Sequence, residues 1–145
     1  MIGFDSFDGL PSAWSNHAKG TFARTSSAPP PLPPDCTNVT FVQGLFADSL
    51  PAFVKTLDPY PHTRVDLLHI DCDLYDSTST VLSLLSPWLH PGCTIVFDEL
   101  VNYPGYEAHE ARAFFEFLHR RSDLSYRCLG WRYLTAAVEL VAAAS

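Results

Sequence analysis

Hydrophobic residues along the chain follow two alternating patterns. Short runs rich in β-branched and aromatic residues indicate strands, and they alternate with stretches whose apolar residues recur at helical spacing. The resulting order is strand, loop, strand, helix, strand, helix, strand, helix, strand, strand. We expect strands at residues 1–4, 38–42, 65–70, 94–97, 125–131 and 134–141, and helices at about residues 48–58, 77–89 and 107–121.

The alternation of strands and helices predicts an α/β fold. The run from Val65 to Ile70 is almost wholly apolar, as in a central parallel strand that is covered on both faces. The last two strands are joined only by Arg132 and Tyr133, which leaves no room for a crossover helix, so we expect them to form an antiparallel hairpin. The pattern therefore predicts a mostly parallel sheet with an antiparallel edge.

A segment without periodicity separates the first two strands. It contains the proline-rich run at residues 29–34, which favours a polyproline II conformation. A P-x-x-P ligand for an SH3-type domain is one interpretation, but we favour a surface loop insertion at about residues 24–37. With 145 residues the chain is long enough for one domain and too short for two ordinary ones, so we expect a single domain at residues 1–145.

Composition narrows the classes of partner. Nine basic residues against 16 acidic residues give a formal net charge of −7, which argues against nucleic acid and anionic membranes as partners. The longest apolar runs are broken by charges or fall short of the roughly 20 residues that a membrane-spanning helix needs. No basic region precedes an apolar stretch at the N-terminus, and the four cysteines form no C-x-x-C pair. We therefore expect a cytoplasmic protein.

Acidic side chains stand at the ends of three predicted strands. Asp5 ends the first strand, Asp71 and Asp73 follow the third, and Asp98 and Glu99 follow the fourth. Ligands of open α/β sheets collect at the carboxyl ends of the parallel strands. A single aspartate there is often only a cap of the turn, but three acid-bearing ends repel each other unless a cation neutralises them. Hard oxygen ligands of this kind suit Mg²⁺.

Asp5 has a second interpretation. A short carboxylate at the end of an early strand can accept hydrogen bonds from both hydroxyls of a ribose, which would suit a nucleoside cofactor. The seven glycines are scattered and form neither G-x-G-x-x-G nor G-x-x-x-x-G-K. Dinucleotide binding and phosphoryl transfer are therefore less favoured.

Five blocks of sequence carry a resemblance to a known family. They are Gly3 to Pro11, Gly20 to Phe22, Gly44 to Pro51, Leu68 to Thr78, and Val96 to Glu99 with Asn102 to Gly105. In this order they resemble the macrocin O-methyltransferase (TylF-type) family, whose members have the Rossmann-like class I methyltransferase fold. The resemblance implies transfer of a methyl group from S-adenosylmethionine to a hydroxyl of a small molecule, such as a sugar or another natural product, assisted by Mg²⁺.

The resemblance also implies roles for single residues. The acids that match the family's metal site are Asp71, Asp98 and Glu99, with Glu99 standing where some members carry a second aspartate. The general base matches Asp71 or Asp73. The residues implied in cofactor binding are Asp5 for the ribose with Ser6 and Phe7 beside it, Gln43, Gly44 and Leu45 beside the adenine, and Asp71.

The implied mechanism is an in-line transfer, in which a carboxylate takes the acceptor's proton and the oxygen attacks the methyl group on sulfur. His69 and His109 are alternative bases, but His69 lies in an apolar strand and His109 on a helix with its own apolar face, so packing is the favoured role for both. Tyr75, Tyr103 and Tyr106 would fit beside an acceptor, although such aromatic residues more often only pack.

The resemblance begins at the family's second strand, so an N-terminally truncated domain is expected. The first strand and its glycine-rich turn, which normally lie between the second and fourth strands, have no counterpart, and we expect the edges of both neighbours to be exposed. An alternative function is therefore a non-catalytic fragment that depends on a partner subunit completing the sheet, and a homo-oligomer is another expectation. A metal-dependent hydrolase could use the same acids but lacks a visible nucleophile or phosphate loop.

Overall fold

The computed structural model describes residues 1–57 and 63–144. The chain folds as two compact units, Met1–Lys55 and Thr56–Ser145, and each unit has a sheet of its own. The single domain expected from the chain length stays a prediction. Within the described ranges, no helix has the length and the apolar character needed to cross a bilayer.

The first unit is built on two parallel strands. Strand β1 (Ile2–Asp5) pairs with β2 (Thr40–Gln43), and Asp5 lies opposite Gln43 at the end of the ladder. Helix α1 (Phe46–Leu57) follows β2 directly. The rings of Phe4 and Phe53 meet edge to face with 5.0 Å between centroids, which anchors the helix on β1. The helix begins at Phe46, about two residues before the predicted start, so Asp48 lies in its first turn, where the helix dipole favours a negative charge.

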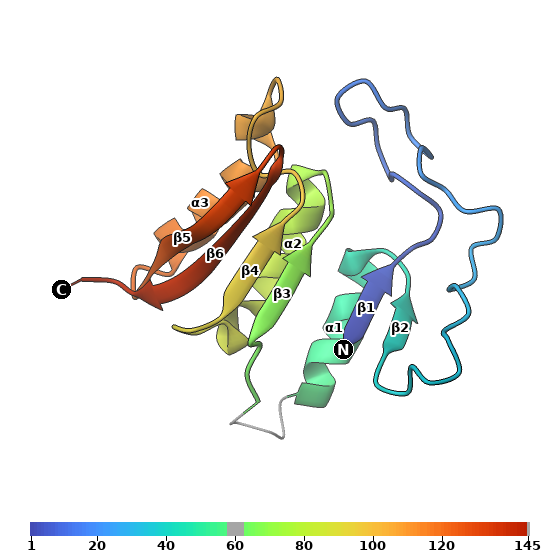
Figure 1. The fold of residues 1–145 in the computed structure, drawn as a ribbon, viewed down its shortest axis with the longest axis horizontal. Coiled ribbons are helices and arrows are strands. Elements are labelled where there is room, and N and C mark those ends of the chain that lie inside the picture. The colour runs from blue at the N-terminus through green and yellow to red at the C-terminus, as the bar shows by residue number, and fades with distance from the viewer. Residues whose placement is uncertain (58–62, 145) are drawn as a thin grey trace. The chain divides into compact units, whose positions relative to one another are not determined.

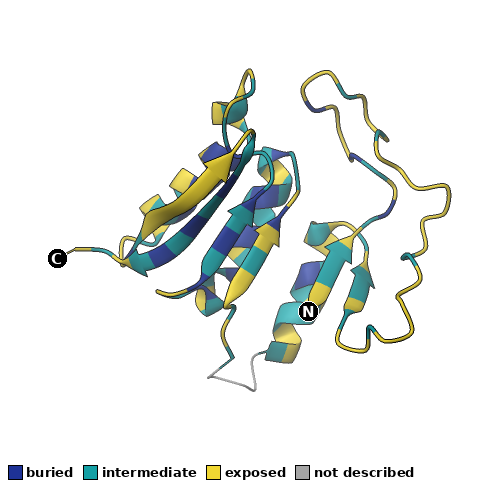
Figure 2. Ribbon diagram, viewed as in Figure 1, coloured by how far each residue is buried: buried dark blue, intermediate teal, exposed yellow. Residues whose placement is uncertain are grey.

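The long connection between β1 and β2 contains no helix or strand. Its first part folds back on itself, because the Leu10 amide donates to Thr21 O at 2.9 Å and the Gly20 amide donates to Leu10 O at 2.9 Å. Phe7, Leu10 and Trp14 are buried there. The proline-rich residues 24–37 follow as an irregular, mostly exposed segment, in agreement with the predicted surface loop (Figure 2).

The second unit holds a four-stranded sheet in the order β3-β4-β6-β5 (Figure 1). Strands β3 (Leu67–Ile70) and β4 (Thr94–Phe97) are parallel. Strands β5 (Leu124–Arg132) and β6 (Thr135–Ala142) form an antiparallel hairpin, and β6 pairs antiparallel with β4. The α/β fold and its antiparallel C-terminal hairpin were both predicted from the sequence and are confirmed.

Two helices cover one face of this sheet. They are α2 (Tyr75–Leu85), which continues as a 3-10 turn at Ser86–Trp88, and α3 (Glu110–Arg120), which follows a 3-10 turn at Tyr106–Ala108 (Figure 1). Alternate residues of β4 and β6 point into the layer between helices and sheet and are buried. The buried apolar side chains of this layer include Leu82, Leu85, Ile95, Phe97, Phe114, Phe117, Val138 and Leu140.

The environment of β3 differs from the prediction. The strand pairs with β4 alone among residues 63–144, and its Leu67 side chain is 60% exposed. The expectation of a central strand covered on both faces is therefore wrong for this sheet, because α2 and α3 cover only one face. Strand β1 likewise pairs with β2 alone among residues 1–57, so β1 and β3 are each an edge strand of their own sheet. The expected exposure of these edges stays a prediction.

Candidate active site

Three carboxylates gather at the carboxyl end of the parallel pair β3–β4. The register places Ile70 opposite Phe97, so Asp71 and Asp98 leave the two strands side by side. The Asp98 amide donates to Ile70 O at 2.9 Å and extends the pairing by one step. Asp71, Asp98 and Glu99 each offer a carboxylate oxygen, and these three oxygens lie within 4.8 Å of one another. The structure therefore brings together the three acids that the sequence assigned to a metal.

Glu99 is the acid of this cluster whose environment is least favourable to a charge. Burial raises its pKa to about 8, and the negative charges of Asp73, Glu110, Asp98 and Asp71 add to the shift. Its Oε2 is buried and has no hydrogen-bond partner within the described ranges. A buried oxygen without a donor, beside two more carboxylates, fits a small divalent cation with hard oxygen ligands such as Mg²⁺.

A fourth carboxylate, which the sequence analysis did not assign to the site, lies behind the cluster. Glu110 is fully buried at the start of α3. It accepts hydrogen bonds from the amides of Cys72 and Glu99 at 3.2 and 3.3 Å. Burial raises its pKa to about 7 and the two amides oppose that shift. The sequence does contain a signal for the burial of Glu110. Its spacing places it on the same helical face as the apolar Phe114 and Phe117.

The two aspartates predicted as general bases both lie in the segment that follows β3. Asp73 has a left-handed backbone with φ of 59°, at the sharp turn before α2. The charges of Asp71 and Asp73 both raise the pKa of Glu99, so both carboxylates lie near that side chain. The structure therefore leaves both as candidates for the proton acceptor.

The histidines considered as alternative bases are placed differently from each other. His69 does not pack into the core as expected: its side chain is 57% exposed, with Nε2 3.9 Å from Asp98 Oδ1. Its side chain is therefore near the acids. His109 immediately precedes α3, and its Nδ1 is buried without a hydrogen-bond partner in the part of the chain that the structure describes. The His109 ring lies against Tyr103 with 6.3 Å between centroids, in keeping with the predicted packing role.

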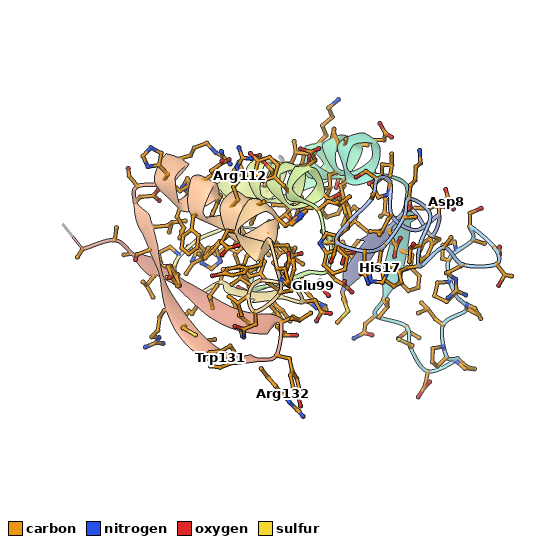
Figure 3. All side chains as sticks on the ribbon, turned by 90° about the horizontal axis from the view of Figure 1, so that it is seen from above. Asp8, His17, Glu99, Arg112, Trp131 and Arg132 are labelled. Atoms are coloured by element: carbon orange, nitrogen blue, oxygen red, sulfur yellow. The ribbon has the colours of Figure 1, made fainter. Side chains whose placement is uncertain are left out.

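A pocket of about 410 Å³ opens directly beside two acids of the cluster. One wall carries Asp98 and Glu99, and the other is the turn of the β5–β6 hairpin. Figure 3 shows Arg132 at this turn, on the side of the sheet away from Arg112 of α3. The hydroxyl of Thr135 reaches across and donates to Asp98 Oδ1 at 3.4 Å. The lining residues are Asp98, Glu99, Arg132, Tyr133, Leu134 and Thr135.

The predicted cofactor residues of the first unit meet at the carboxyl ends of β1 and β2. Asp5 Oδ1 accepts a hydrogen bond from the Phe7 amide at 2.7 Å, which fixes a tight turn with Phe7 at a φ of 60°. The hydroxyl of Ser6 accepts from the Asp8 amide at 3.2 Å. The Gly44 amide donates to Asp5 O at 3.0 Å and ties the end of β2 to that of β1.

Backbone geometry also fits the other residues predicted beside the cofactor. Gly44 has a φ of 134°, which favours glycine at this sharp exit from β2. Gln43 donates from Nε2 to Ser27 O at 2.5 Å, and the Leu45 side chain is 46% exposed. The structure thus places Asp5, Ser6, Phe7, Gln43, Gly44 and Leu45 around one pair of strand ends, while their contacts with a cofactor stay a prediction.

Comparison with known proteins adds independent evidence. Residues 1–100 match the family described as methyltransferase domain, a range that runs from β1 through the acidic cluster. A curated relative from Streptomyces olivaceus, 8-demethyl-8-(2,3-dimethoxy-alpha-L-rhamnosyl)-tetracenomycin-C 4'-O-methyltransferase, is 29% identical over 100 residues, which are 68% of this chain and 36% of that protein. The chain therefore spans only about a third of the length of this relative.

Solved structures of methyltransferases share the fold. The crystal structure of CalS11, a calicheamicin methyltransferase, is 25% identical with a TM-score of 0.67, and the match covers 95% of this chain and 59% of that one. The O-methyltransferase NovP is 19% identical with a TM-score of 0.64, and the match covers 95% and 58% of the two chains. The fold is that of the Rossmann-like class I methyltransferases, and because the family match takes in more than half of its residues, this chain belongs to the methyltransferase domain family.

Proposed function

We propose that this chain is part of the catalytic domain of an S-adenosylmethionine-dependent O-methyltransferase, which uses Mg²⁺ and methylates a hydroxyl of a small molecule. The observation that carries the proposal is the trio of carboxylate oxygens within 4.8 Å of one another beside an open pocket. Membership of the methyltransferase domain family supports the choice of reaction. The narrower assignment to the macrocin O-methyltransferases is part of the proposal.

Asp71, Asp98 and Glu99 would hold the divalent cation. A bound Mg²⁺ would supply Lewis acidity toward the acceptor hydroxyl and lower its pKa. The three acids fit this role because they are hard oxygen donors from neighbouring strand ends and because Glu99 Oε2 has no hydrogen-bond donor in residues 1–57 and 63–144. A cation would also offset the repulsion that raises the pKa of Glu99.

Asp71 or Asp73 would accept the proton of the acceptor hydroxyl. The bound cofactor would supply the methyl group: the acceptor oxygen would bond to the methyl carbon as the bond from that carbon to sulfur breaks, and the electron pair would stay on sulfur. The carboxylate that took the proton returns it to solvent. His69 is a second proton acceptor within reach of the same acids, since its Nε2 lies 3.9 Å from Asp98 Oδ1.

The cofactor would be bound through the strand ends of the first unit. Asp5 keeps one carboxylate oxygen on the Phe7 amide, and its carboxylate has further acceptor capacity for the ribose hydroxyls. Ser6 and Phe7 flank this position, and Gln43, Gly44 and Leu45 would border the adenine. A cofactor-binding role of Asp71 is a separate part of the proposal.

The acceptor that we propose is a sugar hydroxyl or another alcohol of a natural product. The relative from Streptomyces olivaceus is named for methylation of a rhamnosyl group, and CalS11 is described as a calicheamicin methyltransferase. The pocket between Asp98 and the hairpin turn places space for such a small molecule beside the acids. A cytoplasmic location without nucleic-acid or membrane partners, and assembly as a homo-oligomer, remain predictions.

Calorimetric titration of S-adenosylmethionine into the purified chain, with and without Mg²⁺, tests the proposal. We expect this chain alone to bind S-adenosylmethionine weakly at most, because the family's first strand and glycine-rich turn have no counterpart in it. Asp5→Asn should weaken that binding further, and Asp98→Asn should reduce a separate response to Mg²⁺. Glu107→Gln, an exposed acid of the second unit, is the matched control. If neither ligand binds, the proposal fails for this chain alone, and the alternative of a partner-dependent, non-catalytic fragment gains support.

A further inference from the structure

A buried glutamate joins the two strand ends that carry the acidic cluster. Glu110 has 0% exposed surface, which is unusual for a carboxyl side chain. Its two oxygens have different partners: Oε1 accepts from the Cys72 amide at 3.2 Å and Oε2 accepts from the Glu99 amide at 3.3 Å. Cys72 immediately follows Asp71, and Glu99 immediately follows Asp98. One side chain thus holds both acid-bearing segments.

The register of the sheet explains why a side chain is needed at this point. The β3–β4 ladder ends with Ile70 opposite Phe97, and the Asp98 amide adds one more bond to Ile70 O. Cys72 and Glu99 are two residues beyond that last pair, and their amides turn to Glu110 instead of to the neighbouring strand. The carboxylate therefore continues the connection between the strands beyond the end of the sheet.

The chemistry of the contact calls for a carboxylate. Two amides converge on Glu110, and each of its two oxygens accepts one of them. A glutamine of the same shape has only one acceptor oxygen, and its NH₂ group would point a donor at the other amide. An apolar residue would leave both amides without this partner. Another negative charge beside Asp71 and Asp98 adds repulsion, so its placement there is not explained by favourable charge interactions.

We propose that Glu110 is a positioning residue of the metal site. It holds the segment after β3 at a fixed distance from the segment after β4, so that Asp71, Asp98 and Glu99 keep the spacing that one divalent cation can bridge. Glu110 acts through the backbone of Cys72 and Glu99 and does not itself bind the cation. This inference rests on the proposed function, because the spacing of the three acids matters only if they bind a divalent cation.

The test compares Glu110→Gln with Glu107→Gln in the full 145-residue chain. Both changes remove one acid near the start of α3, but Glu107 is exposed. Mn²⁺ is titrated calorimetrically into each variant, well below its thermal midpoint so that all molecules are folded. We expect Glu110→Gln to weaken Mn²⁺ binding by about 10-fold or more, as is typical when the support of a metal ligand is lost, and Glu107→Gln to leave it unchanged.

Amide hydrogen exchange gives a readout that does not depend on the metal. In Glu110→Gln we expect faster exchange at the amide of Cys72 or Glu99, whereas the Asp98 amide, which is bonded to Ile70 O, keeps its protection. Unchanged exchange at both Cys72 and Glu99 would overturn the inference, as would equal Mn²⁺ affinity in wild type and Glu110→Gln. An equal loss in both variants would also overturn it, since a general charge effect would then suffice.

The two proposals fail in different ways. If the wild-type chain binds no Mn²⁺, the metal-dependent function fails, and the role of Glu110 in joining the strand ends is then decided by the exchange rates alone. If the wild type binds Mn²⁺ and Glu110→Gln binds it equally well, the proposed function stands and the positioning role fails.

Discussion

Asp71 and Asp98 follow paired positions of two parallel strands, and each offers an oxygen within 4.8 Å of the other. Two carboxylates at this distance repel each other unless a cation or a proton intervenes. The closeness of the two carboxylates would favour metal binding, but it lowers the stability of the metal-free chain. Asp66 precedes β3 at the other end of the strand, 90% exposed, and serves as a comparison.

We predict that Asp98→Asn stabilises the metal-free chain and weakens its response to metal. Loss of one charge relieves repulsion and should raise the free energy of unfolding by up to about 1 kcal/mol, because the side chain is half-exposed. Mn²⁺ affinity should fall about 10-fold or more. Thermal unfolding with and without Mn²⁺ measures both effects. Asp66→Asn should leave the response to Mn²⁺ intact, and a similar loss in that variant would contradict the prediction.

The stability of the metal-free chain should fall as pH rises from about 5 to about 8. The folded chain retains protons on Glu99 and Glu110, whose pKa values are about 8 and about 7, while the unfolded chain releases them near the ordinary value of 4.5. Between these values the unfolded state binds fewer protons, so unfolding becomes more favourable with increasing pH, and the effect levels off above the folded pKa values.

Thermal midpoints measured in a chelating buffer from pH 5 to pH 9 check this pH dependence. Glu99→Gln removes the group with the larger shift, so its midpoint should depend less steeply on pH than that of the wild type. Glu107 is exposed, and Glu107→Gln should reproduce the wild-type slope. A stability that rises over this range would contradict the raised pKa values.

Much of the fold was predictable because the core of the second unit is periodic. Residues 94–97 form β4 as predicted. A two-residue connection was enough to predict the hairpin, although it lies at Tyr133 and Leu134, one residue later than predicted. The one-sided burial of β3 was not predictable, because the apolar run from Val65 to Ile70 does not reveal which of its faces a helix covers. Such a run fits an edge strand as well as a central one.

The three acids of the candidate metal site were predictable from the sequence, but the role of Glu110 behind them was not. Asp71, Asp98 and Glu99 follow strands directly, so the sheet's parallel register alone brings them together. Glu110 is 38 residues from Cys72 and 11 from Glu99, and local pattern assigns it only a favourable place near the start of a helix. Glu110 is buried because α3 packs on the sheet, and the local sequence pattern does not show that packing.

Neighbouring phenylalanines of α3 should differ sharply in their contribution to stability. Phe114 is fully buried against Phe97 with 5.0 Å between ring centroids, whereas Phe115 is 52% exposed. Phe114→Ala should cost about 3–5 kcal/mol, a large part of the net stability of a domain. Phe115→Ala should cost less than about 1 kcal/mol. Chemical denaturation of the two variants measures the difference, and equal costs would refute this packing of α3.

The loop after β1 should tolerate a side chain at Gly20 better than at Gly9. Both residues have a positive φ, 82° and 74°, so alanine strains both backbones by roughly 1–2 kcal/mol. A Cβ at Gly9 would also lie 2.4 Å from Thr21 O, whereas nothing lies within 4 Å of a Cβ at Gly20. We therefore expect Gly9→Ala, but not Gly20→Ala, to weaken S-adenosylmethionine binding, because the loop that continues from Asp5 would shift. Calorimetric titration of both variants distinguishes them.

Asp5→Asn should separate cofactor binding from metal binding. Asparagine keeps an oxygen that can accept from the Phe7 amide, which Asp5 Oδ1 now does at 2.7 Å, so the turn should persist. Its amide nitrogen is a donor and carries no charge, so the side chain loses the second acceptor that the proposed ribose contact uses. Loss of one hydrogen bond to a charged group predicts roughly a 10-fold weaker affinity for S-adenosylmethionine. Mn²⁺ affinity should not change. Asp8→Asn, an exposed acid three residues further along the chain, should leave both affinities unchanged. If Asp8→Asn weakens cofactor binding as much as Asp5→Asn does, the loss reflects the charge of the loop, and the assignment of Asp5 to the ribose is wrong.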